Sequence, residues 1–374
     1  MNPLEQPPTD IVFRTRSGYP IAEAVRSFKN ALEESGAVAA GKSIHYTADL
    51  VCSGCFELWQ KMLIDYALDH VGISSPRIFH LLNGRFNDLE AGCKKMTSEN
   101  FYRTAEYQSA MAECVLVLRS CPRRPALKMP KVPIESHSDE WIRTSTQGSV
   151  PSAAVGKVFN GTHDLQVVKR VGDEFAKACA DGATEKAFFW MKWLLEEEAR
   201  LKKDSKGGLS SQERGPPGWP NKFRCHIGFF LINLLTEIYK ELAGRQAVRM
   251  HDEFKTILNL YCLPKKTISQ KRRQDLMCLA IQIVCEVPRW KIPAAPALVK
   301  DPLALERAVG HAESFFREVL AYDPPVGDLM KEAKKSGKVV VVKGKTSKQL
   351  HQMNVQEHLA AYDAAIDQWL TGRN

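Results

Sequence analysis

The 374-residue sequence contains no apolar run long enough to cross a membrane. The longest candidate, Ile227 to Leu235, falls far short of the roughly 20 residues that a membrane-spanning helix needs. The opening residues, MNPLEQPPTD, have neither the basic stretch nor the apolar stretch of a secretory signal. We therefore expect an intracellular protein, in the cytoplasm, the nucleus, a virus factory or a virion, that is not secreted and has no membrane partner.

The common catalytic motifs are also absent. Neither HExxH nor GxSxG occurs, and the ten histidines form no cluster. Of the ten cysteines only Cys52 and Cys55 have CxxC spacing, without the second pair of ligands that a structural zinc site needs. Because intracellular cysteines stay reduced, we interpret them as buried thiols rather than disulfides. The sequence thus predicts no catalytic residue, no metal and no cofactor, and hence a protein that is not an enzyme.

What the chain does contain is an ordinary globular composition with an excess of positive charge. Hydrophobic residues make up 44% and charged residues 25% of the sequence, which is typical of a folded protein. The formal net charge is +9 at pH 7. Lysine and arginine neutralise phosphates and release counterions, so this charge favours a polyanionic partner, either nucleic acid or an acidic protein surface.

The spacing of apolar residues predicts helices along most of the chain. From Ile44 to Pro76 apolar side chains recur at three- and four-residue steps, interrupted at Ser53-Gly54, which predicts two helices with one apolar face each. Such faces must be buried against other helices. The tryptophan-rich phrase from Phe188 to Leu194 fits a packed helix face better than a base-stacking surface. We expect further helices over about 20–36, 76–92, 98–121, 163–180, 183–203, 223–243, 245–263, 268–287, 302–322 and 346–370.

The predicted fold class is all-α, multi-helical, with two helical lobes, basic extensions and at most a minor β-hairpin. The strand-like phrase is Lys338 to Lys343, four valines between two lysines. Residues 122–162 are rich in proline, serine, glycine and basic residues. A second polar insertion spans Ser205 to Lys222, and its composition predicts a flexible segment. The expected organisation is an extended arm (1–19), an N-terminal helical lobe (20–121), a linker or long loop (122–162), a C-terminal helical lobe (163–322) and a basic extension with a terminal helix (323–374).

Residues 36–43, GAVAAGKS, match the GxxxxGKS pattern of a phosphate-binding loop, in which Gly36, Gly41, Lys42 and Ser43 would bind the nucleotide. Such a loop needs a buried strand before it and a helix after it. The preceding residues, IAEAVRSFKNALEES, have helical spacing instead. We interpret the match as accidental, with Gly36 ending one helix and Ser43 capping the next. A nucleotide-dependent enzyme is the alternative that this pattern leaves open.

Basic residues gather in three places. One group follows a predicted helix end and a run of prolines, one crowds a predicted helix start, where the helix dipole disfavours cations, and one surrounds the valine run. We interpret them as candidate nucleic-acid contacts, with a solvated surface as the alternative. The residues are Arg119, Arg123, Arg124, Lys128 and Lys131; Lys265, Lys266, Lys271, Arg272 and Arg273; and Lys338, Lys343 and Lys345.

Several phrases resemble a known family. ADLVCSG (48–54), DHVGISSP (69–76), VLVLRSCPRRPALK (115–128) and KAFFWMKWL (186–194) are similar to the helical C-terminal region of the replication-associated recombination ATPases, the RarA/MgsA relatives of clamp loaders. Related bacterial and large-DNA-virus proteins carry these helices without the ATPase. The chain departs from the family phrase at His70 and at Ser74-Ser75, and arginine replaces the family's Lys-Ser pair near residue 123. The resemblance spans about residues 20–245 and implies a clamp-loader-like helical fold without the ATPase activity.

From the charge and the resemblance we expect a non-catalytic DNA-associated accessory protein of replication and repair. The alternative is a structural subunit of a large assembly, such as a viral capsid or nucleoprotein particle, because a proline-rich arm and a basic extension suit a subunit that reaches into its neighbours. In both cases the expected state is a homo-oligomer or a subunit of a larger assembly.

Overall fold

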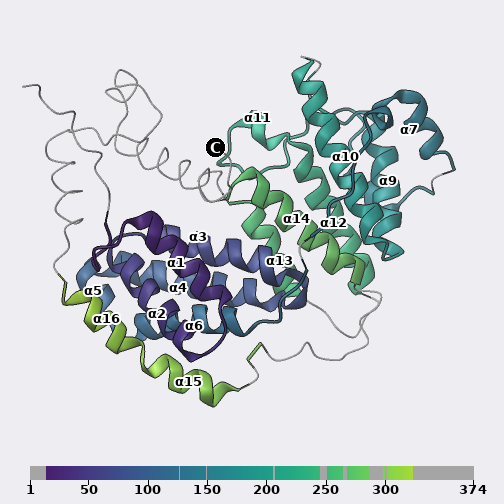
Figure 1. The fold of residues 1–374 in the computed structure, drawn as a ribbon. Helices are drawn as coiled ribbons and strands as arrows, with labels where there is room; N and C mark the ends of the chain where they lie inside the picture. The colour runs from purple at the N-terminus through teal and green to yellow at the C-terminus, as the bar shows by residue number, and fades with distance from the viewer. Residues whose placement is uncertain are drawn as a thin grey trace, which may run out of the picture. The chain divides into compact units, whose positions relative to one another are not determined.

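The protein is all-α over the residues that the structure describes (Figure 1). This structure, a computed structural model, describes residues 14–125, 127–148, 150–204, 207–244, 251–263, 268–286, 298–299 and 301–322. Most of the predicted arm, the predicted hairpin at Lys338 to Lys343 and the predicted helix over 346–370 lie outside these ranges. No helix in the described ranges has the length and apolar character to cross a bilayer.

The chain divides into two compact units. Unit 1 comprises residues 1–64, 84–120 and 299–374, and unit 2 comprises residues 65–83 and 121–298. This division differs from the two lobes expected from the sequence, because residues 65–83 belong to the unit built mainly from later residues and the segment from 299 belongs to the unit built mainly from earlier ones.

Unit 1 is built around helix α2 (Ala37–Cys52). From Thr47 to Cys52 every residue of α2 is buried, because α1, α6 and α16 pack around it. A helix end that is enclosed in this way must satisfy its polar side chains internally. Thr47 does so by donating to the Ser43 carbonyl oxygen at 2.8 Å and accepting from Trp59 Nε1 at 3.2 Å. The other helices of unit 1 are α1 (Ile21–Glu33), most of α3 (Phe56–Tyr66), the later part of α4 (Arg77–Lys95), α5 (Ser98–Arg103), α6 (Ala105–Ser120), α15 (Pro302–Gly310) and α16 (Ala312–Leu320).

Unit 2 is built around helix α14 (Gln270–Glu286), against which α9, α10, α12 and α13 pack. All residues from Leu276 to Ile281 are buried. The tryptophan-rich phrase lies in α10, where Trp190 and Trp193 are buried, which confirms the prediction of a packed face. The remaining elements are η1 (Ala67–Val71), η2 (Gly72–Ser74), η3 (Ile134–His137), α7 (Asp139–Ser145), α8 (Ala153–Val158), α9 (Gln166–Ala180), α10 (Thr184–Lys203), α11 (Asn221–Arg224), α12 (Ile227–Ala243) and α13 (His251–Tyr261).

The predicted helix break at Ser53-Gly54 is confirmed, but three predicted single helices, 98–121, 223–243 and 302–322, are wrong. The break follows α2 because Gly54 has a φ of +80°, which glycine adopts without strain. The segment 98–121 instead forms α5 and α6, since Thr104 is extended and its hydroxyl donates to the Asn100 carbonyl oxygen at 2.8 Å, a local bond that competes with helix continuation. The segment 302–322 is likewise divided into α15 and α16, next to Gly310. The segment 223–243 is interrupted at Cys225-His226, between α11 and α12.

The prediction of an unstructured linker over 122–162 is also wrong. This segment contains η3, α7 and α8, and buries Ile142, Ala154 and Val155. Its apolar residues are too few to produce a visible helical period, and its short helices begin at local signals such as Ser138, whose hydroxyl accepts from the Trp141 amide at 3.3 Å. Sparse apolar residues therefore suffice where neighbouring helices supply the rest of the core.

Replacing Trp59 by alanine is expected to lower the free energy of unfolding by about 3–5 kcal/mol. The indole is fully buried, stacks with Phe56 at 5.8 Å and meets Phe86 edge-on at 5.7 Å. Urea unfolding followed by circular dichroism measures the change. Val38→Ala, at a residue that is 76% exposed, serves as the control and should change stability by less than about 0.5 kcal/mol. Similar losses in the two variants would contradict the assigned core.

Candidate functional site

The phosphate-loop pattern lies within a helix. Gly36 is the residue before α2, with a φ of +94°, and Gly41, Lys42 and Ser43 are inside the helix. The expectation that Gly36 ends one helix and Ser43 caps the next is therefore wrong, because α2 already begins at Ala37. Ser43 is buried and donates to the Ala40 carbonyl oxygen at 2.7 Å. This geometry offers no loop of free amides that could surround a phosphate.

The CxxC pair consists of free thiols. Burial raises the pKa of Cys52 and of Cys55 to about 12 in each case, so both are protonated at neutral pH. A thiol in that state is a poor nucleophile and a poor metal ligand. The described residues also contain no group of three or more His, Cys, Asp or Glu side chains placed to hold a metal ion.

Two arginines of the first basic cluster bind backbone carbonyls. Arg119 donates to the Glu34 carbonyl oxygen at 2.9 Å, between α1 and α2. Arg124 donates its guanidinium to the Leu68 carbonyl oxygen at 2.7 Å, and its amide donates to the His70 carbonyl oxygen at 2.8 Å. Burial lowers the pKa of Arg124. These two side chains therefore hold the fold together, and their sequence context gave no sign of it.

The arginines at the start of α14 are also held by the protein. Arg272 contacts three carboxylates, those of Asp65 at 2.8 Å, Asp69 at 2.6 Å and Asp275 at 3.0 Å. Although burial favours the neutral form, the hydrogen bonds and charges of these carboxylates raise the pKa of Arg272 above its usual value. Arg273 lies over the Trp219 ring at 4.5 Å and donates to the Tyr261 carbonyl oxygen at 3.1 Å. The contacts of Arg272 and Arg273 thus explain why these cations lie at a helix start, which the sequence alone did not explain.

Some of the lysines and arginines predicted to contact nucleic acid are exposed in the part of the chain that the structure describes. Most of these lie on one segment of unit 2, which we call the cationic loop (residues 121–133). Arg123, Lys128 and Lys131 are exposed there. Arg124 fixes one part of the loop to η1, and Lys192 Nζ donates to the Pro130 carbonyl oxygen at 2.9 Å. Lys271 is exposed in the first turn of α14. Lys265, Lys266, Lys338, Lys343 and Lys345 lie outside the described residues.

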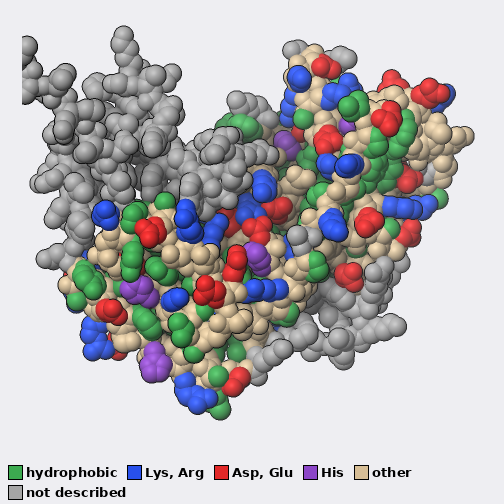
Figure 2. Space-filling view, viewed as in Figure 1, with side chains coloured by type: hydrophobic (Ala, Val, Ile, Leu, Met, Phe, Trp, Pro, Cys, Tyr) green, Lys and Arg blue, Asp and Glu red, His purple; other side chains and the backbone are tan. Residues whose placement is uncertain are grey.

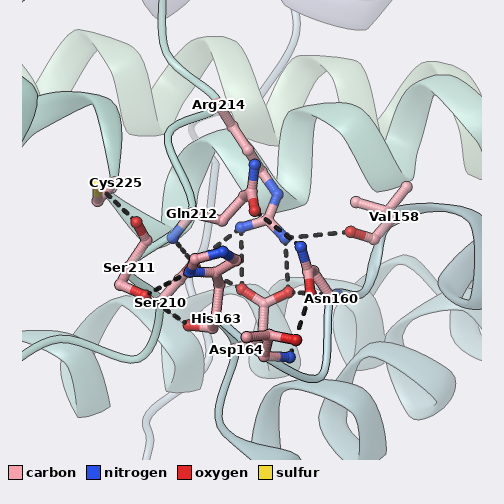
Figure 3. A network of polar contacts seen from close by, with 10 residues as sticks. Val158, Asn160, His163, Asp164, Ser210, Ser211, Gln212, Arg214 and Cys225 are labelled. Carbon is pink, nitrogen blue, oxygen red and sulfur yellow. Dashed lines mark hydrogen bonds and ion pairs between the residues drawn. The ribbon is translucent and has the colours of Figure 1, made fainter.

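A buried ion pair that the sequence did not predict lies elsewhere in unit 2 (Figure 3). The Asp164 side chain is completely buried and accepts two hydrogen bonds from the Arg214 guanidinium, at 2.5 and 2.9 Å. It also accepts from Ser210 Oγ at 2.6 Å and from the Asn160 amide at 2.8 Å. With four donors, this carboxylate is fully paired, and its arrangement is that of a structural anchor.

Around this pair the two polar segments 158–165 and 209–214 are joined by further contacts. The Leu165 amide donates to the Leu209 carbonyl oxygen at 3.0 Å, and Asn160 Nδ2 donates to Gln212 Oε1 at 2.9 Å. His163 Nδ1 lies 3.1 Å from Ser211 Oγ (Figure 3). The insertion that the sequence marked as flexible is thus held in place over 209–214.

A hollow of about 850 Å³ adjoins this network. It is lined by residues 157–161, residues 212–214 and one face of α12. On α12 the lining residues are spaced by three or four positions, so they form one polar stripe on a helix that is otherwise mostly buried. These residues are Asn233, Thr236, Glu237 and Lys240. The sequence signal for this stripe was Asn233, the polar residue within the longest apolar run.

No family model, no curated protein and no solved structure matches this chain. The resemblance to the helical region of the recombination ATPases therefore stays a prediction from short phrases, and the function has to be inferred from the residues themselves.

Replacing Arg214 by methionine is expected to lower the free energy of unfolding by about 3–5 kcal/mol, because it leaves the buried Asp164 carboxylate without its cation. Combining it with Asp164→Asn should recover part of this loss, since the amide carries no charge. Urea unfolding of the single and double variants measures the difference. A double variant no more stable than Arg214→Met alone would contradict a charge effect.

Replacing Arg272 by glutamine is expected to weaken the dependence of stability on acid pH. The hydrogen bond and charge of Arg272 lower the pKa of Asp69 below its usual value, although burial acts in the opposite direction. A carboxylate with a lowered pKa stabilises the fold above its unfolded-state pKa, and this contribution is lost as pH falls through the folded-state pKa. Unfolding free energies measured from pH 7 to pH 3 should therefore fall less steeply in Arg272→Gln, from a lower starting value. Lys177→Gln, which removes a positive charge from an exposed position of α9, is the control.

Proposed function

We propose that this protein binds nucleic acid without catalysing a reaction, as an accessory protein of replication or repair, and that the cationic loop makes the phosphate contacts. The observation that carries the proposal is the combination of exposed lysines at 128 and 131 with a backbone that is fixed at Arg124 and at Pro130. Phosphate contacts require cations that face solvent and are held in register.

Anchoring the loop matters because a long cationic side chain loses conformational freedom when it binds. A fixed backbone leaves only the side chains to be ordered, so each contact retains more of its favourable free energy. Lys128 and Lys131 lie three positions apart on this anchored segment, and neither is paired with a described carboxylate. They are therefore available to a phosphate backbone.

The distribution of charge on the surface favours a local contact with nucleic acid over a broad one. On the face that Figure 2 presents, positive and negative side chains are interspersed over the described residues, and no wide area of one sign stands out. Long-range attraction of a polyanion would need such an area. The assignment to replication or repair comes from the resemblance alone, whereas binding of a polyanion is supported by the loop.

The second candidate is a structural subunit of a large assembly. Its support is the exposure of large apolar side chains on unit 2, with Ile134 at 89% and Val150 at 73% exposed. A homo-oligomer or larger particle in light scattering, unchanged by added nucleic acid and reduced in size by Ile134→Ser, favours this candidate.

Replacing Lys128 and Lys131 together by glutamine is expected to weaken DNA binding and its dependence on salt. Each lost phosphate contact should reduce the slope of log K against log salt by about 0.9 for duplex DNA and about 0.7 for single strands. Fluorescence anisotropy with labelled duplex and single-stranded DNA across a salt series measures both quantities.

The matched control is Lys177→Gln with Lys186→Gln, which removes the same charge from two exposed positions of unit 2 outside the loop. If both double variants lose the same slope, binding reflects only net charge and the loop has no special part in it. If the unaltered protein binds neither form of DNA, the proposed function falls.

A further inference from the structure

The hollow beside the Asp164–Arg214 pair presents amide groups that the fold does not use. Within the described residues, Gln212 accepts a hydrogen bond from Asn160 through Oε1, and its Nε2 donors have no partner. The Asn233 carboxamide likewise has no partner among the described residues. Both residues line the hollow. Gln212 thus offers donors, and Asn233 offers a donor and an acceptor, to whatever occupies it.

These groups are carried by segments that are held rigidly. Asn160 and Gln212 sit on the two segments that the buried Asp164–Arg214 pair joins (Figure 3), and Asn233 sits on a helix whose other faces are largely buried. A binding site needs its contacting side chains fixed by a surrounding shell of this kind. The buried pair would therefore serve to hold the walls of the hollow in place.

The charged side chains that line the hollow are already paired, which indicates that a ligand there, or the part of it that enters the hollow, is uncharged. The two lysines that line the hollow are paired with carboxylates, Lys240 with Glu237 at 2.6 Å and Lys157 with Glu241 at 3.2 Å. Arg214 is taken by Asp164. A phosphate in the hollow would have to compete with these carboxylates, whereas a neutral group with hydrogen-bonding edges would not.

We propose that the hollow binds an adenine base. Asparagine and glutamine carboxamides pair with the adjacent donor and acceptor on the edge of adenine, and an aromatic ring stacks on the face of a base. Phe159 supplies an aromatic ring to the wall of the hollow, and its volume of about 850 Å³ lies within the range of small-molecule sites. The adenine can come from an unstacked nucleotide of a bound strand or from a free nucleoside.

This proposal rests on the proposed function where the base belongs to a bound strand, but it is tested separately. The probe is adenosine, which has no phosphate and so does not depend on Lys128 or Lys131. Isothermal titration calorimetry with the full chain measures its binding, with uridine as the comparison nucleoside.

Two nearly isosteric variants remove the proposed contacts. Gln212→Glu keeps the oxygen that accepts from Asn160, loses the donors and adds a negative charge. Asn233→Asp replaces a donor by an acceptor, also with a negative charge, at an exposed position. Each should weaken adenosine binding about tenfold or more. Gln147→Glu, at an exposed position of unit 2 outside the hollow, adds the same charge and should leave binding unchanged.

The outcomes separate the two proposals. The adenine site is supported if both variants weaken adenosine binding and the Lys128/Lys131 double variant leaves it unchanged. If the protein binds adenosine in this way but does not bind DNA, the hollow is a site for the free nucleoside. Absence of adenosine binding, equal binding of uridine, or no effect of either variant overturns the adenine site, and leaves the salt-dependent DNA contact to stand or fall by its own test. The two variants should also weaken binding of a twelve-nucleotide adenine strand more than binding of an abasic strand of the same length. Equal weakening for the two strands overturns the proposal that the hollow binds a base of a strand.

Discussion

A helix whose apolar surface extends around most of its circumference has to be covered on every side, and this requirement organises both units. In unit 1 the end of α2 is buried from Thr47 to Cys52, and part of its cover is α16, which follows it by some 260 residues of sequence. In unit 2 α14 is enclosed by four helices drawn from residues 166–261. The recruitment of α15 and α16 into unit 1 follows from this need for cover, as do the helices within 122–162.

Enclosing helices in this way leaves backbone carbonyls and side-chain carboxylates in places that water does not reach, and arginine is the residue that satisfies them. Its five donors and permanent charge allow one side chain to bind several acceptors. Arg124, Arg214, Arg272 and Arg273 all act in this manner, and Arg119 does the same at a more exposed position. Lysine has a compact and strongly hydrated charge, and at positions 128 and 131 it stays on the surface. This chemical difference explains why four of the arginines predicted to contact nucleic acid are structural while Lys128 and Lys131 remain exposed.

The helices were largely predictable because the apolar period of a long amphipathic segment is set by local geometry. The break at Ser53-Gly54 was predictable for the same reason, since glycine alone accepts the required φ. The break at Thr104 was not, because it depends on a single side-chain hydrogen bond, and neither was the partner of any arginine. Asp69 and Arg272 are separated by 203 positions, and nothing in the neighbourhood of either residue indicates the other.

The hollow likewise could not be predicted from the sequence. Its lining comes from three segments that the sequence marked differently: an expected linker, an expected flexible insertion and an apolar helix. What joins the first two of them is the Asp164–Arg214 pair, whose desolvation cost is offset because Ser210 and Asn160 complete the carboxylate's hydrogen bonds. A pair of this type stabilises less than an apolar contact of equal size, so its presence between two polar segments points to a geometry that must be held fixed. Gln212 and Asn233 are the side chains that line the hollow beside this pair, and in the proposed adenine site their unused amide groups would contact the base.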